Sequence, residues 1–223
     1  MSQSLTENNI VISIDKASIA VLPLETFAGK ITVVDTPEKV AAAVDVLMRE
    51  KVVGFDTETR PSFKKGKVNH VALMQFSTSG HCFLFRVNKI GITPELRSFI
   101  ENPDIIKVGL SLKDDFSVMH RSDDFSPSSF IDLQHYVNQF HIADLGLQRI
   151  YAILFGRRIS KHQRLTNWEA EELSEGQQIY AAIDAWACLR IYSYLRSGKF
   201  IPSESPYIRQ PESGDGENCN VEI

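Results

Sequence analysis

Short apolar runs bounded by turn residues recur along the first two thirds of the chain. Runs of this kind are typical of strands buried in a sheet, and the Ser79-Gly80 dipeptide between two of them predicts a hairpin. The last run leads directly into a helix. Strands are expected within residues 30–34, 52–58, 70–78, 81–87, 104–111 and 128–136.

Other segments carry apolar residues at helical spacing. Thr36 followed by Pro37 predicts the start of one helix, and Gly156 predicts the end of another. The clearest helix opens with a capping box formed by Ser174 and Gln177. Helices are expected near residues 13–22, 35–50, 92–102, 113–121, 145–156 and 174–198. Strands mixed with helices predict an α/β fold with a mixed sheet.

Length and composition set the expected domain organisation. The chain has 223 residues, of which 43% are hydrophobic and 23% charged, as in an ordinary globular domain with a sizeable core. We expect a flexible N-terminus over residues 1–12, the domain over 13–197, and a mostly disordered, Pro- and Gly-rich tail over 198–223. The sequence shows no apolar run long enough for a membrane helix and no signal peptide.

Charge and cysteine usage limit the expected partners and compartment. The net charge of −4 excludes a global basic field, so any contact with nucleic acid needs a local basic patch. Cys82, Cys188 and Cys219 form no CxxC pair and no disulfide framework. This usage fits a reducing compartment, and we expect a cytoplasmic protein without a membrane partner.

Two carboxylates stand at the end of a predicted buried strand. Asp56 and Glu58 follow the apolar run 52–55 and, as residues i and i+2 of a strand, point to the same face. Two like charges there repel each other and are costly to desolvate, and a divalent cation such as Mg²⁺ or Mn²⁺ removes both problems. For this short pattern alone, two solvated acids in a loop are the simpler interpretation.

Further acids have structural interpretations as well. Tyr180 and Asp184 lie four residues apart in the long predicted helix, so they share a face whose surroundings are apolar. A metal would partner such an acid, but a buried Asp that accepts a hydrogen bond accounts for it equally well. Asp114 and Asp115 stand at a strand-to-helix junction, where an aspartate is normally a cap or a partner of the helix dipole.

Together, three segments resemble one enzyme family. "FDTET" (55–59), "KVGLSLKDDF" (107–116) and "YAAIDA" (180–185) look like the three motifs of the DnaQ-like, ribonuclease H-fold 3′–5′ exonucleases, in the same order. The resemblance extends over about residues 30–195, and "GKVNHVALMQFST" looks especially like the Werner-type exonuclease domain. It implies a ribonuclease H-like mixed sheet flanked by helices.

The resemblance also implies the catalytic site. The second-motif acid matches Asp115, six residues after Gly109, with Asp114 as the alternative. Tyr180 matches the tyrosine that positions the attacking water, which places the chain in the tyrosine subclass. The family's four metal-binding, catalytic acids match Asp56, Glu58, Asp115 and Asp184.

The activity that the resemblance implies is metal-dependent 3′–5′ exonuclease activity. Two divalent cations, Mg²⁺ or Mn²⁺, would support phosphodiester hydrolysis, and nucleoside 5′-monophosphates would leave a free 3′ end. The partner would be nucleic acid, with DNA favoured over RNA. Two alternatives stay open: a non-catalytic nucleic-acid-binding module on the same fold, and a phosphoesterase of small nucleotides.

Two basic stretches, "RPSFKKGK" and "GRRISKHQR", stand beside the first and third motifs. For any single residue a solvated loop is the simpler interpretation, but the positions beside the motifs favour contacts with backbone phosphates, and Phe63 offers a surface for base stacking. The candidate nucleic-acid-binding residues are Arg60, Phe63, Lys64, Lys65, Lys67, Arg157, Arg158, Lys161 and Arg164.

Overall fold

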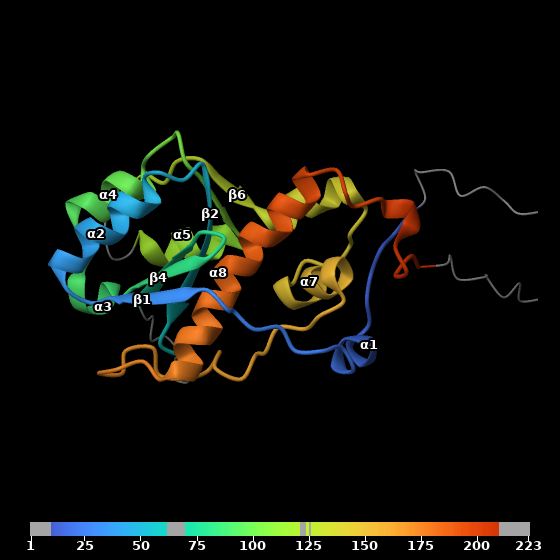
Figure 1. Cartoon of the computed structure of the whole chain (residues 1–223), viewed down its shortest axis with the longest axis horizontal. Coiled ribbons are helices and arrows are strands. Elements are labelled where there is room, and N and C mark those ends of the chain that lie inside the picture. The colour runs from blue at the N-terminus through green and yellow to red at the C-terminus, as the bar shows by residue number, and fades with distance from the viewer. Residues whose placement is uncertain (1–9, 62–69, 121–123, 125, 210–223) are drawn as a thin grey trace, which may run out of the picture.

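A six-stranded mixed sheet forms the centre of the computed structural model, which describes residues 10–61, 70–120, 124 and 126–209 (Figure 1). The strand order is β1-β4-β3-β2-β5-β6. Strand β3 runs antiparallel to β2 and β4, and the other neighbouring pairs are parallel. The predicted α/β fold with a mixed sheet is confirmed. The strands span Lys30–Val34 (β1), Val52–Thr59 (β2), Val71–Ser77 (β3), His81–Phe85 (β4), Ile106–Gly109 (β5) and Phe130–Asp132 (β6).

Helices cover both faces of this sheet. The longest, α8 (Glu175–Arg196), crosses one face with α7 (Leu147–Phe155) beside it, and α2 (Pro37–Leu47) and α4 (Pro94–Ile100) cover the other face (Figure 1). Among the described residues, no helix combines the length and apolarity needed to cross a membrane. The remaining helical elements are α1 (Lys16–Ala20), α3 (Val87–Ile90), α5 (Leu112–Met119), α6 (Leu133–Tyr136), η2 (Val137–Phe140) and η3 (Pro202–Glu204).

Alternation along the strands divides the core into two clusters. On β4, Cys82 and Leu84 pack with residues of α7 and α8, whereas Phe83 and Phe85 pack with residues of α2 and α4. A strand that is buried on both faces is apolar at successive positions, which is why the sequence shows continuous apolar runs here.

Several helix ends follow the local signals in the sequence. The capping box is present: Gln177 donates its backbone N–H to Ser174 Oγ at 3.2 Å, and Ser174 donates its own to Gln177 Oε1 at 3.0 Å. Gly156 ends α7 in the left-handed conformation, with a φ of 61°. Thr36 precedes α2 as predicted, but its side chain makes no capping hydrogen bond.

Residues near both ends of the described chain pack against each other. Ile12 is fully buried and forms bridges to Ile142 and Ile208, and Arg209 donates its backbone N–H to the carbonyl of Val11 at 2.8 Å. These contacts extend the packed body beyond the predicted range 13–197 at both ends. Residues 1–9 and 210–223, for which we expect flexibility, lie outside the described part of the chain.

A glycine fixes how closely α8 approaches the sheet. A Cβ atom on Gly54 of β2 would lie 1.8 Å from the carbonyl oxygen of Ala185, so only glycine fits there. Gly54 stands two residues before Asp56, and Ala185 directly follows Asp184. The close crossing therefore brings a position on α8 next to the end of β2.

Candidate active site

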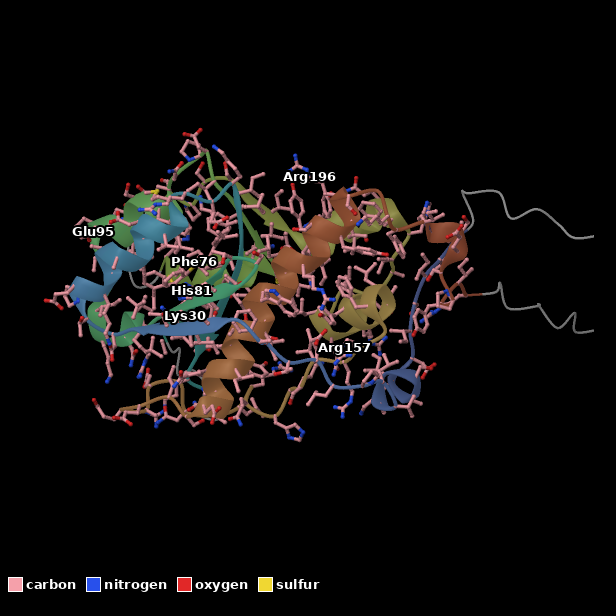
Figure 2. The ribbon with its side chains drawn as sticks, viewed as in Figure 1. Lys30, Phe76, His81, Glu95, Arg157 and Arg196 are labelled. Atoms are coloured by element: carbon pink, nitrogen blue, oxygen red, sulfur yellow. The ribbon has the colours of Figure 1, made fainter. Side chains whose placement is uncertain are left out.

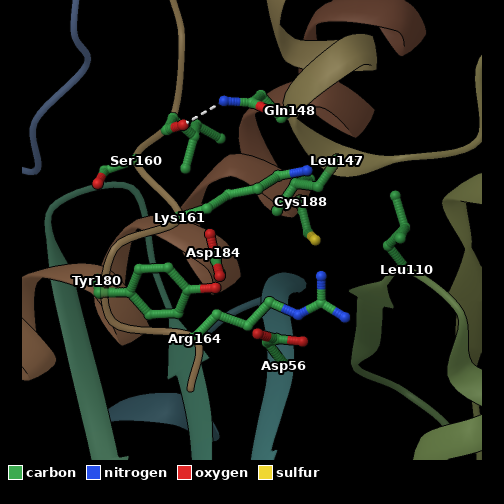
Figure 3. A pocket seen from close by; sticks show the side chains of 11 residues that line it. Asp56, Leu110, Leu147, Gln148, Ser160, Lys161, Arg164, Tyr180, Asp184 and Cys188 are labelled. Atoms are coloured by element: carbon green, nitrogen blue, oxygen red, sulfur yellow. Dashed lines mark hydrogen bonds between the residues drawn. The ribbon is translucent and has the colours of Figure 1, made fainter. Parts of the chain in front are cut away.

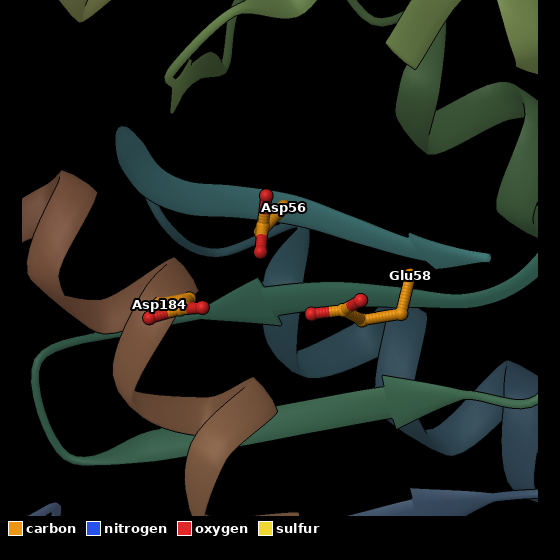
Figure 4. Close-up of side chains that lie close together, drawn as sticks. All are labelled: Asp56, Glu58 and Asp184. Atoms are coloured by element: carbon orange, nitrogen blue, oxygen red, sulfur yellow. The ribbon is translucent and has the colours of Figure 1, made fainter. Parts of the chain in front are cut away.

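Three carboxylates from two elements meet where α8 crosses β2 (Figure 4). Asp56 and Glu58 lie on β2, on the face that α8 covers, and Asp184 lies on α8. One oxygen of each carboxylate lies within 4.8 Å of the other two. The acids of the short D-x-E pattern, Asp56 and Glu58, and the buried helical acid Asp184 thus form one cluster. None of the sequence motifs alone predicted that they meet.

A fourth acid, Asp115, approaches the cluster from α5. Thr57 Oγ1 donates to Asp115 Oδ1 at 2.6 Å, and the charge of Asp115 contributes to the raised pKa of both Asp56 and Glu58. Asp114 is exposed and accepts instead from Ser111 Oγ at 3.2 Å. The structure therefore brings Asp115, and not Asp114, toward the other acids.

The junction before α5 is held by Asp132, the last residue of β6. Its carboxylate accepts the backbone N–H of Ser111 at 3.1 Å and that of Leu112 at 2.9 Å. Ser111 is held there in the left-handed region, with a φ of 66°. This arrangement fixes the start of the helix that carries Asp115.

Burial raises the pKa of every acid in the cluster, and repulsion by other cluster acids adds to the rise in Asp56 and Glu58. Burial, followed by the charges of Asp184 and Glu58, raises the pKa of Asp56 well above its usual value. Burial and the charge of Asp184 raise the pKa of Glu58 to about 9, and burial raises the pKa of Asp115 and of Asp184 to about 7. In the described part of the chain, no lysine or arginine forms an ion pair with any of the four.

The donor set fits a hard divalent cation. The clustered ligand atoms are carboxylate oxygens only, and no histidine or cysteine joins them among the residues that the structure describes. Oxygen donors of this kind suit Mg²⁺ and Mn²⁺ rather than a soft thiolate-binding metal. A bound cation would also relieve the repulsion that raises the pKa of these acids.

Tyr180 lies one helical turn before Asp184 and lines the same cavity, and its hydroxyl opposes the rise that burial causes in the pKa of Asp184. Burial, together with the charge of Asp184, raises the pKa of the Tyr180 hydroxyl far above its usual value. The ring packs against Trp168, which is fully buried, with the ring centroids 5.9 Å apart. The hydroxyl thus lies beside the acid cluster and stays protonated at neutral pH.

A cavity of about 240 Å³ opens beside these groups (Figure 3). Asp56, Tyr180 and Asp184 line one part of it, and two of the predicted basic residues, Lys161 and Arg164, extend over the acids. Burial raises the pKa of Asp184 and of Glu58, and the charge of Lys161 opposes this rise for Asp184 as that of Arg164 does for Glu58. Both cations therefore act on the cluster although neither forms an ion pair with it. The cavity therefore presents cations and carboxylates to the same small volume.

The second basic stretch divides between two surroundings. Arg157 lies beside the end of α7 and forms an ion pair with Glu25 at 3.1 Å (Figure 2). Arg158 donates to the carbonyl oxygen of Leu22 at 3.0 Å. These two arginines hold residues 22–25, and the structure does not bring them to the cavity, unlike Lys161 and Arg164.

The first basic stretch lies largely outside the described residues, which end at residue 61 and resume at residue 70. Arg60 is described, is exposed, and forms an ion pair with Glu169 at 3.2 Å. A contact of this stretch with nucleic acid stays a prediction. The candidates outside the described part of the chain are Phe63, Lys64, Lys65 and Lys67.

Sequence analysis missed part of the cavity lining. Gln148, near the start of α7, donates from Nε2 to the carbonyl oxygen of Ile159 at 2.6 Å and thereby ties α7 to the loop that carries Lys161. Cys188 could have been found, because it stands one helical turn after Asp184. The first turn of α7 carries no such signal, since only tertiary packing brings it to the acids.

Comparisons with known proteins identify the family of this chain. The family described as 3′–5′ exonuclease matches residues 31–198. The bifunctional 3′–5′ exonuclease/ATP-dependent helicase WRN of Mus musculus is 34% identical over 150 residues, covering 65% of this chain and 11% of that protein. A 3′–5′ exonuclease of Arabidopsis thaliana is 33% identical over 150 residues, covering 65% of this chain and 52% of that protein.

More distant similarities extend this comparison. A ribonuclease D of Gluconacetobacter diazotrophicus is 26% identical over 167 residues, covering 73% of this chain and 41% of that protein. The crystal structure of the Aedes aegypti Nibbler EXO domain superposes with a TM-score of 0.69 at 23% identity, covering 81% of this chain and 96% of that domain, which supports the ribonuclease H-like fold. The chain spans from about a tenth to about half of the length of these three curated relatives.

Proposed function

This chain belongs to the 3′–5′ exonuclease family, and from that membership we propose that it hydrolyses nucleic acid from free 3′ ends and releases nucleoside 5′-monophosphates. In each cycle, the oxygen of a water would join phosphorus as the bond from phosphorus to the 3′-oxygen breaks. The shortened strand would keep a 3′-hydroxyl. The observation that carries this proposal is the meeting of Asp56, Glu58 and Asp184 within 4.8 Å in a partly buried site.

The acid cluster would hold two divalent cations, Mg²⁺ or Mn²⁺. Asp56 would contribute to both, Glu58 and Asp184 to one, and Asp115 to the other. When bound, such cations supply an activated water and neutralise charge that develops on the phosphate. The support for this assignment is the all-oxygen donor set and the excess negative charge, which no described lysine or arginine offsets by direct pairing.

The protein's own groups would orient the reactants. The Tyr180 hydroxyl, which lines the same cavity as Asp184, would direct the attacking water by a hydrogen bond. Its raised pKa argues against a role as general base, because a phenol of this kind stays protonated at neutral pH. Lys161 and Arg164 would contact phosphates of the strand, since they line the same cavity as Asp56.

We favour DNA over RNA as the substrate, because the motif segments look most like the Werner-type exonuclease domain and the mouse relative has the higher identity, 34% against 26% for the ribonuclease D. The relative named ribonuclease D makes RNA the alternative that an assay must separate. The free thiols of Cys82 and Cys188, both buried, agree with a reducing compartment, and we keep the cytoplasm as the proposed location.

A cleavage assay on 5′-labelled oligonucleotides tests the proposal. Single-stranded and recessed-end DNA and RNA are incubated with the protein in Mg²⁺ or Mn²⁺, and Asp184→Asn serves as the matched inactive control. We expect a ladder of products shortened from the 3′ end, formed faster on DNA. An intact oligonucleotide with shifted mobility would instead identify a non-catalytic binding module, and cleavage of small nucleotides only would identify a phosphoesterase.

A further inference from the structure

A buried glutamine without a partner lies in the centre of the sheet. Gln75 on β3 is 0% exposed, and neither its Oε1 nor its Nε2 has a hydrogen-bond partner among the described residues. Buried side-chain amides in folded proteins almost always have a partner, and an exception needs an explanation. An apolar residue of the same size would fill this position without leaving two polar atoms unpaired.

The sheet register places this amide beside the acid cluster. Gln75 stands directly opposite Asp56 in the antiparallel pair of β2 and β3, and opposite residues of such a pair point to the same face. Leu73, two positions away on β3, belongs to the apolar cluster that includes residues of α8. The side chains of Gln75 and Asp56 therefore lie next to each other in the layer between the sheet and α8.

Among the described residues, no side chain donates a hydrogen bond to the Asp56 carboxylate. Burial raises the pKa of Asp56 and a backbone hydrogen bond from Thr57 lowers it, whereas Asp115 accepts a side-chain hydrogen bond from the Thr57 hydroxyl. Carboxylates that hold a metal are normally oriented by a neighbouring donor. Gln75 is the cross-strand neighbour of Asp56 and carries two unused N–H groups.

We propose that Gln75 is a positioning residue for Asp56, donating from Nε2 to the Asp56 carboxylate in the cation-loaded protein and fixing the direction in which its oxygens point. This inference rests on the proposed function, because Asp56 is placed there as the acid shared by both cations. The register already puts the two side chains next to each other, and rotation of the amide about its terminal bond can turn Nε2 toward Asp56.

The test replaces the amide by an apolar chain of similar length, Gln75→Met, with Gln75→Leu as a second variant of different shape. Leu73→Met is the matched control, because Leu73 faces the same layer, stands opposite Glu58, and has no amide. Three quantities are measured: Ca²⁺ affinity by calorimetry, kcat and KM on a labelled oligonucleotide in Mn²⁺, and thermal unfolding in EDTA.

In Gln75→Met we expect Ca²⁺ affinity and kcat to fall by about 10- to 100-fold, the usual effect of losing a donor that orients a metal ligand. KM should change little, since the strand contacts are elsewhere. The midpoint of unfolding in EDTA should stay the same or rise, because the substitution removes two buried polar atoms that lack partners. Leu73→Met should keep wild-type Ca²⁺ affinity and kcat.

Other outcomes would overturn the inference. Wild-type Ca²⁺ affinity and kcat in Gln75→Met would make the amide a packing group, and so would an equal loss in Leu73→Met. Failure of both Gln75 variants to fold would assign the amide to folding instead of to Asp56. Absence of Ca²⁺ binding and of cleavage in the wild-type protein is a distinct result, which would reject the proposed function itself and this inference with it.

Discussion

Replacing Asp184 with Asn should stabilise the protein at pH 8 in the absence of divalent cations, although it removes an acid from a functional cluster. The pKa of Asp184 is higher in the folded protein than in the unfolded chain, because burial disfavours the charged form. The folded state therefore binds the proton more tightly. The contribution of this group to the free energy of unfolding is complete below about pH 4 and is lost as the pH rises through about 7.

The magnitude follows from the pKa values. A rise from 3.8 to about 7 is about 3 pKa units, and at about 1.4 kcal/mol per unit the ionised form costs about 4 kcal/mol at pH 8. Asp184 is only 8% exposed, so solvent screens little of this cost. Allowing about 1 kcal/mol for a less favourable polar interaction of the amide with its surroundings leaves a gain of about 3 kcal/mol. For a chain of this size that gain raises the midpoint of thermal unfolding by roughly 6–12 °C.

Thermal unfolding followed by circular dichroism in EDTA, at pH 4, 6 and 8, measures this effect. The variant should match the wild type at pH 4 and exceed it increasingly toward pH 8. Asp144→Asn is the control, because Asp144 is also 8% exposed. Burial acts to raise the pKa of Asp144, but hydrogen bonds from Arg149 and the Ile14 backbone outweigh it and lower that pKa. The Asp144→Asn variant should therefore be destabilised at pH 8. A loss of stability at pH 8 in Asp184→Asn would refute the reasoning and identify Asp184 as a structural acid.

Three further predictions concern the reaction. EDTA should abolish cleavage and Mg²⁺ or Mn²⁺ should restore it, and full activity in EDTA measured on labelled DNA would exclude the metal-dependent mechanism. Tyr180→Phe should lower kcat by a factor of about 10² and leave the Ca²⁺ affinity measured by calorimetry unchanged, because the hydroxyl positions water and not the cation. Wild-type turnover in this variant would mean that Tyr180 has only a packing role. The double variant Lys161→Gln, Arg164→Gln should lower the slope of log affinity against log salt by about 1.4, which fluorescence anisotropy in Ca²⁺ measures; an unchanged slope would place the strand elsewhere.

Local signals in the sequence were sufficient for most elements of the fold. Apolar runs identified the strands because β2, β3 and β4 are buried on both faces and tolerate few polar residues. The capping box identified the start of α8 because its hydrogen bonds join residues three apart, which needs no tertiary contact. The resemblance of three short motifs to one enzyme family then gave the fold, and the family match confirms it.

The tertiary structure decided which acids meet and which cations face them. The resemblance favoured Asp115 and kept Asp114 as the alternative, and the orientation of α5, fixed by the bonds of Asp132 to the backbone before it, is what brings Asp115 to the other acids. Arg158 and Lys161 stand in the same basic stretch, yet one binds residue 22 and the other lines the cavity.

The sequence by itself determined the strands, the helices and the residue types that the chemistry needs, because these depend on neighbours within a few positions. What only the tertiary structure decided is the cluster itself. Asp56 and Asp184 are separated by 128 positions in the chain, and they meet because Gly54 lets α8 approach β2 to within contact of the Ala185 carbonyl. Gln75 is the polar residue of an otherwise apolar run, but its unpaired amide beside Asp56 follows from the strand register, which is a property of the assembled sheet.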